Sequence, residues 1–201
     1  MKYLEKIQGL LPVGYLYLIL LGLLKEGIMY YQLGINVLKY SSITDILISP
    51  VSELSSSPAL IIIVISFCIL FFILQTLLVK NSHKKWARKI LGETRFTPET
   101  DKKEIQQVIF PFIVLFLAIE LLWVFVGLGV GEGNTVSRSI IKNDFKCNYK
   151  VSFNSGKSEE VYIFDSNSAY YFYVSKGEKN IKIAPVTTIS NLELINNKKL
   201  K

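Results

Sequence analysis

The stretch ALIIIVISFCILFFILQTLLV, residues 59–79, decides the fold class of this chain. It is a run of 21 residues without a charged side chain. At a rise of about 1.5 Å per residue such a helix extends roughly 30 Å, which is the thickness of the hydrocarbon core of a bilayer. We therefore predict a transmembrane helix over residues 59–79.

Two other apolar stretches have the length and composition of a membrane span. The first covers residues 8–31 and continues past Lys25 and Glu26, and no small-x-small cleavage site follows it, so we expect an uncleaved anchor rather than a signal peptide. The second is VIFPFIVLFLAIELLWVFVGLGV, residues 108–130, and the glycine-rich residues 131–134 are expected to end it.

Two polar segments connect the predicted spans. Residues 42–56 are amphipathic and predict a connecting helix on the membrane surface, with a re-entrant segment as the alternative. Ser42 and Asp45 have the spacing of a capping box, and Pro50 is expected to break or kink the helix. The basic loop 80–107 is expected to hold a short interfacial helix anchored by Lys84, Lys85, Trp86 and Arg88.

The composition changes at about residue 137. Short runs alternate between apolar and polar residues, and turn signals rich in Asn, Ser, Asp and Gly separate them at residues 154–156, 165–167 and 176–178. This pattern predicts about five short antiparallel strands, which form a small barrel or a curled sheet. We therefore expect a membrane domain over residues 1–136 and a β-rich domain outside the membrane over residues 137–201.

The distribution of basic residues predicts the orientation. The loop 80–107 carries eight Lys and Arg residues, and cytoplasmic loops carry an excess of these residues. The N-terminus is then cytoplasmic, and the β-rich domain is periplasmic or extracellular. The composition, rich in Lys, Asn, Ser and Ile, is typical of an AT-rich bacterial genome, so we expect a multi-pass protein of the bacterial inner membrane.

Charged residues within the predicted spans are the first candidate site. Lys25, Glu26 and Glu120 lie at membrane depth, where charged side chains usually face the interior of a helix bundle and have partners. By helical rise Lys25 lies about 22 Å from one boundary and Glu120 about 18 Å, which predicts a Lys25–Glu120 ion pair that fixes helix packing, with Glu26 turned toward the outer interface. Two alternatives remain: span one ends at Leu24, or Glu120 titrates on an ion or proton path.

An aromatic strand in the β-rich domain is the second candidate site. Tyr170, Tyr171 and Tyr173 flank Phe172, and exposed aromatic residues are good anchors of protein interfaces. Alternate residues of a strand face opposite sides, so half of these side chains are expected in the core and the others on a partner-binding face.

Several function classes are excluded by the sequence. It contains no GxSxG, HExxH, P-loop or GxGxxG motif, and two cysteines and one histidine do not make a metal site, so we expect neither an enzyme nor a cofactor. The net charge of +7 comes from scattered basic residues that flank apolar blocks, which argues against nucleic acid as a partner.

The leading functional hypothesis is a non-enzymatic inner-membrane protein whose outward β domain recognises a protein or envelope partner. A membrane immunity protein and an accessory subunit both belong to this class. The alternative is a homo-oligomeric channel or transporter subunit that uses Glu120 and Lys25. A third hypothesis, a membrane-tethered sensor whose basic loop contacts anionic lipid or a cytoplasmic partner, ranks last because this loop is short.

Overall fold

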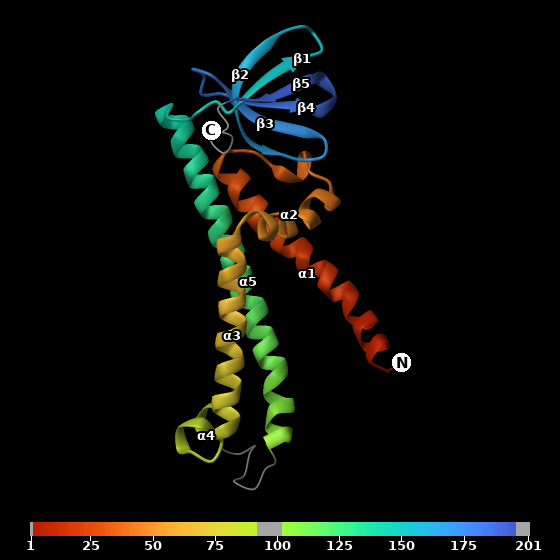
Figure 1. Cartoon of the computed structure of the whole chain (residues 1–201), viewed down its shortest axis with the longest axis vertical. Coiled ribbons are helices and arrows are strands. Elements are labelled where there is room, and N and C mark those ends of the chain that lie inside the picture. The colour runs from red at the N-terminus through yellow and green to blue at the C-terminus, as the bar shows by residue number, and fades with distance from the viewer. Residues whose placement is uncertain (1, 92–101, 196–201) are drawn as a thin grey trace. The chain divides into compact units, whose positions relative to one another are not determined.

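The computed structural model describes residues 2–91 and 102–195, a mostly helical chain with a β-sheet after the last long helix (Figure 1). The helical elements are α1 (Lys2–Gln32), η1 (Val37–Lys39), α2 (Ile43–Ser56), α3 (Pro58–Lys80), α4 (Lys85–Leu91), α5 (Lys102–Lys142) and η2 (Val186–Thr188). The strands are β1 (Tyr149–Phe153), β2 (Ser158–Ser166), β3 (Tyr170–Ser175), β4 (Ile181–Pro185) and β5 (Ile189–Leu194).

Three of the described helices are long and apolar enough to cross a membrane. These candidate spans are Gln8–Gln32, Pro58–Lys80 and Lys103–Lys142, and each contains one of the predicted stretches completely. The first helix continues without a break through Lys25 and Glu26, as predicted. Both charged residues therefore belong to a helix that ends about two turns later, at Gln32.

The predicted capping box is present at the start of α2. The backbone N–H of Asp45 donates to Ser42 Oγ over 3.1 Å, and the backbone N–H of Ser42 donates to Asp45 Oδ2 over 2.9 Å. This reciprocal pair satisfies backbone donors that have no partner within the helix. The expected break at Pro50 is absent, because α2 continues through Pro50 to Ser56.

The expectation that residues 131–134 end the third span is wrong. The helix α5 is 41 residues long and continues to Lys142. Each glycine costs a helix about 1 kcal/mol relative to alanine, so packing must compensate for this cost. The second half of α5 buries one face at intervals of three or four residues: Phe125, Gly129, Gly133, Val136 and Ile140.

The strands form one antiparallel sheet in the order β4-β3-β2-β1-β5. Tight turns connect β1 to β2 and β3 to β4, as the turn signals predict, and Gly156 and Gly177 take the positive φ angles of 85° and 80° that favour glycine. The sheet is open, because β4 and β5 lie at its two edges and do not pair. Of the two predicted forms, the barrel is therefore wrong.

The two faces of the sheet are buried in different ways. On one face, Phe172 and Val174 of β3 pack against apolar residues of α1, η1 and α5, namely Met29, Tyr30, Val37, Val136 and Ile140. On the other face, the strands build a core of their own around Val151, Val161 and Tyr173. The sheet thus depends on the helix ends for the burial of one of its faces.

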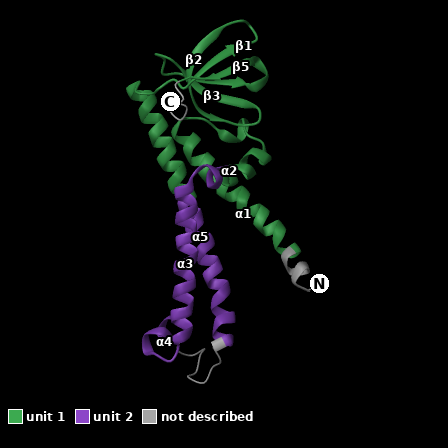
Figure 2. Cartoon of the chain, in the orientation of Figure 1, with its two compact units in different colours: residues 1–51, 125–201 green, residues 52–124 purple. Residues whose placement is uncertain are grey.

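The chain divides into two compact units, and α2 and α5 each contribute to both (Figure 2). One unit comprises residues 1–51 and 125–201, that is α1, η1, most of α2, the end of α5 and the sheet. The other comprises residues 52–124. In this second unit, Ile105 and Ile109 of α5 pack against Val79 of α3.

Candidate functional site

Two glycines allow α5 to contact the backbone of α1 directly. A Cβ atom at Gly129 would lie 2.5 Å from the carbonyl oxygen of Lys25, and one at Gly133 would lie 3.0 Å from that of Met29. Glycines at positions i and i+4 present a flat strip on a helix, and this spacing is typical of closely packed membrane helices. Any larger residue at Gly129 would have to move the backbone of α1.

The side chain of Gln32 closes the same contact at the end of α1. Its Nε2 donates to the carbonyl oxygen of Gly129 over 3.3 Å and to that of Val130 over 3.4 Å. The helix α1 is therefore joined to α5 both by close backbone packing and by an amide that bonds to main-chain acceptors. Together these contacts fix the register of the two helices.

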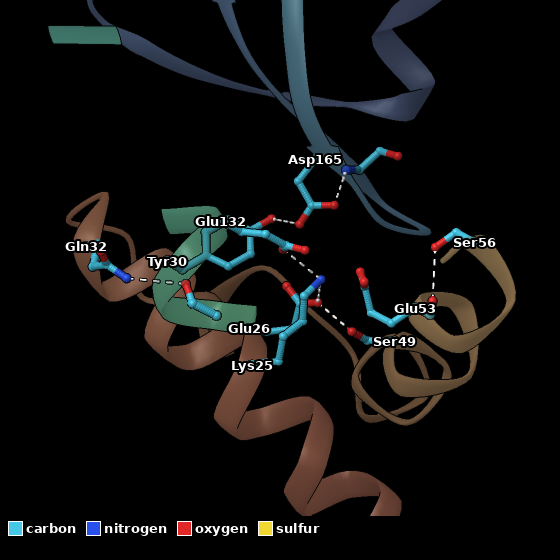
Figure 3. A network of polar contacts seen from close by, with 11 residues as sticks. Lys25, Glu26, Tyr30, Gln32, Ser49, Glu53, Ser56, Glu132 and Asp165 are labelled. Atoms are coloured by element: carbon cyan, nitrogen blue, oxygen red, sulfur yellow. Dashed lines mark hydrogen bonds and ion pairs between the residues drawn. The ribbon is translucent and has the colours of Figure 1, made fainter. Parts of the chain in front are cut away.

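This crossing buries a charge cluster around Lys25 (Figure 3). Lys25 is 6% exposed, and its Nζ lies 3.1 Å from Glu132 Oε2 and 3.4 Å from Glu26 Oε1. A buried ammonium group is tolerated only when it is paired, because its desolvation costs several kcal/mol. The ion pair between Lys25 and Glu132 thus connects α1 to α5 at the point where their backbones are close.

Glu26 is buried and does not turn toward the outer interface, which corrects that expectation. It is 9% exposed, and Ser49 Oγ of α2 donates to its Oε1 over 2.5 Å. One turn earlier, Gly22 of α1 lies against the carbonyl group of Ile46 of α2, where a Cβ atom would overlap the oxygen. The second half of α1 therefore packs closely on α2 as well as on α5.

A second polar contact joins α1 to the sheet. The hydroxyl of Tyr30 donates to Asp165 Oδ2 over 2.6 Å, and its ring packs edge-on against Phe172 with 4.9 Å between the ring centroids. Asp165 also accepts from the backbone N–H of Ser166 over 2.7 Å. Burial, together with the negative charge of Glu26, raises the pKa of Asp165 to about 6.

The turn between β2 and β3 bonds to the segment around the start of α2. Asn167 Nδ2 donates to the carbonyl oxygen of Tyr40 over 3.1 Å, and Ser168 Oγ donates to Asp45 Oδ2 over 3.1 Å. Burial opposes ionisation of Asp45, but hydrogen bonds from Ser42 and Ser168 outweigh it and lower its pKa. The side chain of Asp45 therefore takes part in the cap of α2 and also accepts a hydrogen bond from the turn between β2 and β3.

One of the three tyrosines proposed for partner binding lies in the core of the sheet. Tyr173 is 4% exposed and belongs to the core of the sheet, so its selection for a partner-binding surface is wrong. Its hydroxyl donates to Glu159 Oε1 over 3.3 Å, and burial raises its pKa to about 12. Tyr170 and Tyr171 are half-buried, and Tyr170 packs edge-on against Tyr40.

A short helix, α4, is present where the interfacial helix was predicted, and its location at a membrane interface stays a prediction. Lys84 and Lys85 are exposed, Trp86 is 48% exposed, and the side chain of Arg88 lies outside the described residues. Residues 92–101 of the basic loop also lie outside them. The half-buried Glu120 belongs to the second unit, so its pairing with Lys25 stays a prediction.

Sequence reasoning missed the residues that complete the cluster. Glu132 lies in the glycine-rich segment that was expected to follow the helix, and Ser49 and Asp165 carry no local signal. The spacing of Gly129 and Gly133 is the signal that was available, because it marks a strip for close helix packing. In the described parts of the chain no cluster of three or more His, Cys, Asp or Glu residues has the arrangement of a metal site.

These features define a helical protein with three candidate membrane spans and an open five-stranded sheet fixed to two helix ends. In comparisons with known proteins, no protein-family model, curated protein or solved structure matches this chain.

Proposed function

We propose that this chain is a non-enzymatic integral protein of a bacterial inner membrane that presents its sheet, outside the cytoplasm, to a protein or envelope partner. The observation that carries the proposal is the shared core between the sheet and the ends of α1 and α5. A sheet that is built onto two helix ends is held at a defined distance from the bilayer, whereas a sheet on a linker is not.

The exposed surface of the helices supports membrane insertion. Large apolar side chains are exposed along all three candidate spans, among them Leu16, Ile62, Phe72, Phe116 and Trp123. In water such surfaces are unfavourable, whereas in a bilayer they face acyl chains. The basic residues Lys84 and Lys85, next to the exposed Trp86, match the composition of an interfacial anchor at the cytoplasmic boundary.

A photo-crosslinking amino acid tests both parts of the proposal in living cells. At Leu194, which is 53% exposed on the edge strand β5, we expect an adduct with one protein of defined mass. At Leu11, which is 64% exposed on α1, we expect adducts with lipid. If neither Leu194 nor the exposed Lys176 gives an adduct with a protein, partner recognition is contradicted. If Leu11 gives no adduct with lipid, membrane insertion is contradicted.

The orientation is tested by labelling Cys147 with a membrane-impermeant maleimide in intact cells. Cys147 is a free cysteine just before β1, and Cys68 is a free cysteine within the candidate span α3. We expect labelling of the parent chain from outside and none of Cys147→Ser, which retains Cys68. Labelling that requires permeabilised cells would place the sheet in the cytoplasm.

The channel hypothesis receives no support from Lys25, because carboxylates neutralise it and it is 6% exposed. A lysine that lines a conduction path needs contact with water or with the ion.

A further inference from the structure

We propose that Asp165, together with Tyr30 and Glu26, forms a partly buried proton-binding site that controls how firmly the sheet is attached to α1. A bound proton closes the contact, and loss of the proton loosens it. The proposal concerns the attachment of the sheet and does not depend on the identity of any partner.

The geometry of the first unit supports a site for one proton. The charged and titratable groups that face Asp165 come from two helices: Lys25, Glu26 and Tyr30 on α1, and Glu132 on α5 through its ion pair with Lys25. In the turn that follows Asp165, Ser168 bonds to the carboxylate of Asp45 of α2. Glu26, Glu132 and Asp165 thus bring three carboxylates to one ammonium group.

Lys25 is not placed to neutralise Asp165 fully. Its ammonium group lies 3.1 Å and 3.4 Å from oxygens of Glu132 and Glu26, while Asp165 relies on neutral donors, the hydroxyl of Tyr30 and the backbone N–H of Ser166. When Asp165 ionises, two neighbouring carboxylates of a buried contact carry charge at once, and this arrangement favours the protonation of one of them.

The direction of the pH effect follows from the raised pKa. Asp165 titrates at about 6 when the contact is closed and near 3.8 when it is exposed to water, so the closed state holds a proton that the open state has released. The stabilisation is complete below pH 3.8 and is lost as the pH rises through about 6. The two values set an upper limit of about a hundredfold on the change in the opening equilibrium.

The contact lies where its loss affects the rest of the sheet. Tyr30 is 1% exposed and packs in one cluster with Met29, Val37 and Phe172. Asp165 marks a shift in the pairing register of β2 and β3, where the ladder is interrupted between Ile163 and Asp165. Loss of the contact between Tyr30 and Asp165 therefore exposes to water the place where the pairing of β2 and β3 is irregular.

Hydrogen–deuterium exchange of the full chain in nanodiscs tests the proposal between pH 5 and pH 7.5. After correction for intrinsic exchange, amides of residues 165–175 should lose protection as the pH rises, by up to about tenfold over this range, with a midpoint near 6. Amides of β1, in the same sheet, serve as the internal control and should stay constant. Asp165→Asn, which cannot titrate, should remove the pH dependence of residues 165–175.

Two further variants keep the proposal falsifiable even if Asp165→Asn does not fold. Glu26→Gln removes the neighbouring negative charge and should move the midpoint to lower pH. Tyr30→Phe removes a hydrogen bond that favours the ionised form and should move it to higher pH. A parent protein without pH dependence, or midpoints that both move in the same direction, would overturn the proposal.

Discussion

Replacement of Gly129 by alanine should destabilise the protein through one added methyl group. The new Cβ would lie 2.5 Å from the carbonyl oxygen of Lys25, whereas ordinary contact begins at 3.4 Å, so the backbones of α1 and α5 must separate by 0.9 Å (3.4 − 2.5). Overpacking of this kind typically costs about 1–3 kcal/mol. Separation of the two helices also weakens the ion pair between Lys25 and Glu132 and the amide bonds of Gln32.

Gly131→Ala is the matched control, because it lies two residues away in the same helix and a Cβ there meets nothing within 4 Å. Alanine in place of glycine stabilises a helix by about 0.5–1 kcal/mol, and this gain is common to both variants. The difference between the two free energies of unfolding therefore isolates the overlap, and we expect about 1–3 kcal/mol.

The free energies are measured by unfolding in mixed detergent micelles, with helical circular dichroism as the signal. If Gly129→Ala and Gly131→Ala agree within about 0.5 kcal/mol, the close approach of α5 to Lys25 is refuted. Gly133→Ala is expected to cost less than Gly129→Ala, because part of its overlap is with the flexible side chain of Gln32.

Two more substitutions probe the other contacts of the first unit. Gly22→Ala should destabilise the protein by at least as much as Gly129→Ala, because its Cβ meets a backbone carbonyl of α2. Gly27→Ala is the control and should not destabilise the protein, because a Cβ there has open space around it. Equal stability of Gly22→Ala and Gly27→Ala would argue against packing of α1 on α2. Asp45→Ala should cost about 1–2 kcal/mol in thermal unfolding because it removes the cap of α2 and the bonds to Ser168, whereas Asp45→Asn retains an acceptor and should cost less. An alanine variant as stable as the parent would contradict this role.

The helices and strands could be predicted because their signals are local. A span of apolar residues has the length of the bilayer wherever it occurs, and the alternation in residues 149–183 shows the strands without reference to the rest of the chain. The capping box at Ser42 and Asp45 is equally local, since a segment of four residues contains both of its hydrogen bonds. Such features depend on short stretches of sequence alone.

The end of the third span was predicted wrongly because glycine has two opposite effects on a helix. It lowers helix propensity, and it also allows a second helix to approach closely. By propensity, glycines at 129, 131 and 133 end a helix. In this structure two of them lie against α1, and the packing that they permit offsets their cost. Propensity considers the helix alone, whereas the outcome depends on a second helix about 100 residues earlier in the chain.

The ion pair between Lys25 and Glu132 shows the same limit. The depth estimate selected Glu120, whose pairing with Lys25 stays a prediction, and it did not consider Glu132, because residues 131–134 were expected to end the helix. The helix α5 continues to Lys142, which brings Glu132 into a helical position opposite Lys25. The Tyr30–Asp165 contact joins residues 135 positions apart, and no property of either residue indicates the other. Contacts of this kind follow only from the packed structure.

The openness of the sheet could not be derived from strand number. Five short strands can close into a barrel when their own side chains fill the interior. Here the side chains of Phe172 and Val174 pack against residues of α1, η1 and α5. The helix ends therefore supply the burial that the interior of a closed barrel would otherwise provide. The small size of residues 137–201 predicts that packing on the membrane part or on a second copy of the chain supplies missing burial, but it does not indicate which helix ends do so.

The ion pair between Lys25 and Glu132 tests the account most directly, because it joins α1 to α5 at the crossing that carries the sheet. The measurement is a double-mutant cycle with Lys25→Met and Glu132→Gln, using the free energy of unfolding in micelles. We expect a coupling energy of about 1–2 kcal/mol, which exceeds that of an exposed ion pair because the Lys25 side chain is buried, but is limited because the Glu132 side chain is 37% exposed.

The control cycle combines Lys25→Met with Lys176→Met, which breaks an exposed ion pair with Glu160 elsewhere in the unit, and should be additive. The account predicts coupling in the first cycle and none in the control. Additivity within about 0.5 kcal/mol in both cycles would contradict it, since Lys25 and Glu132 would then not interact.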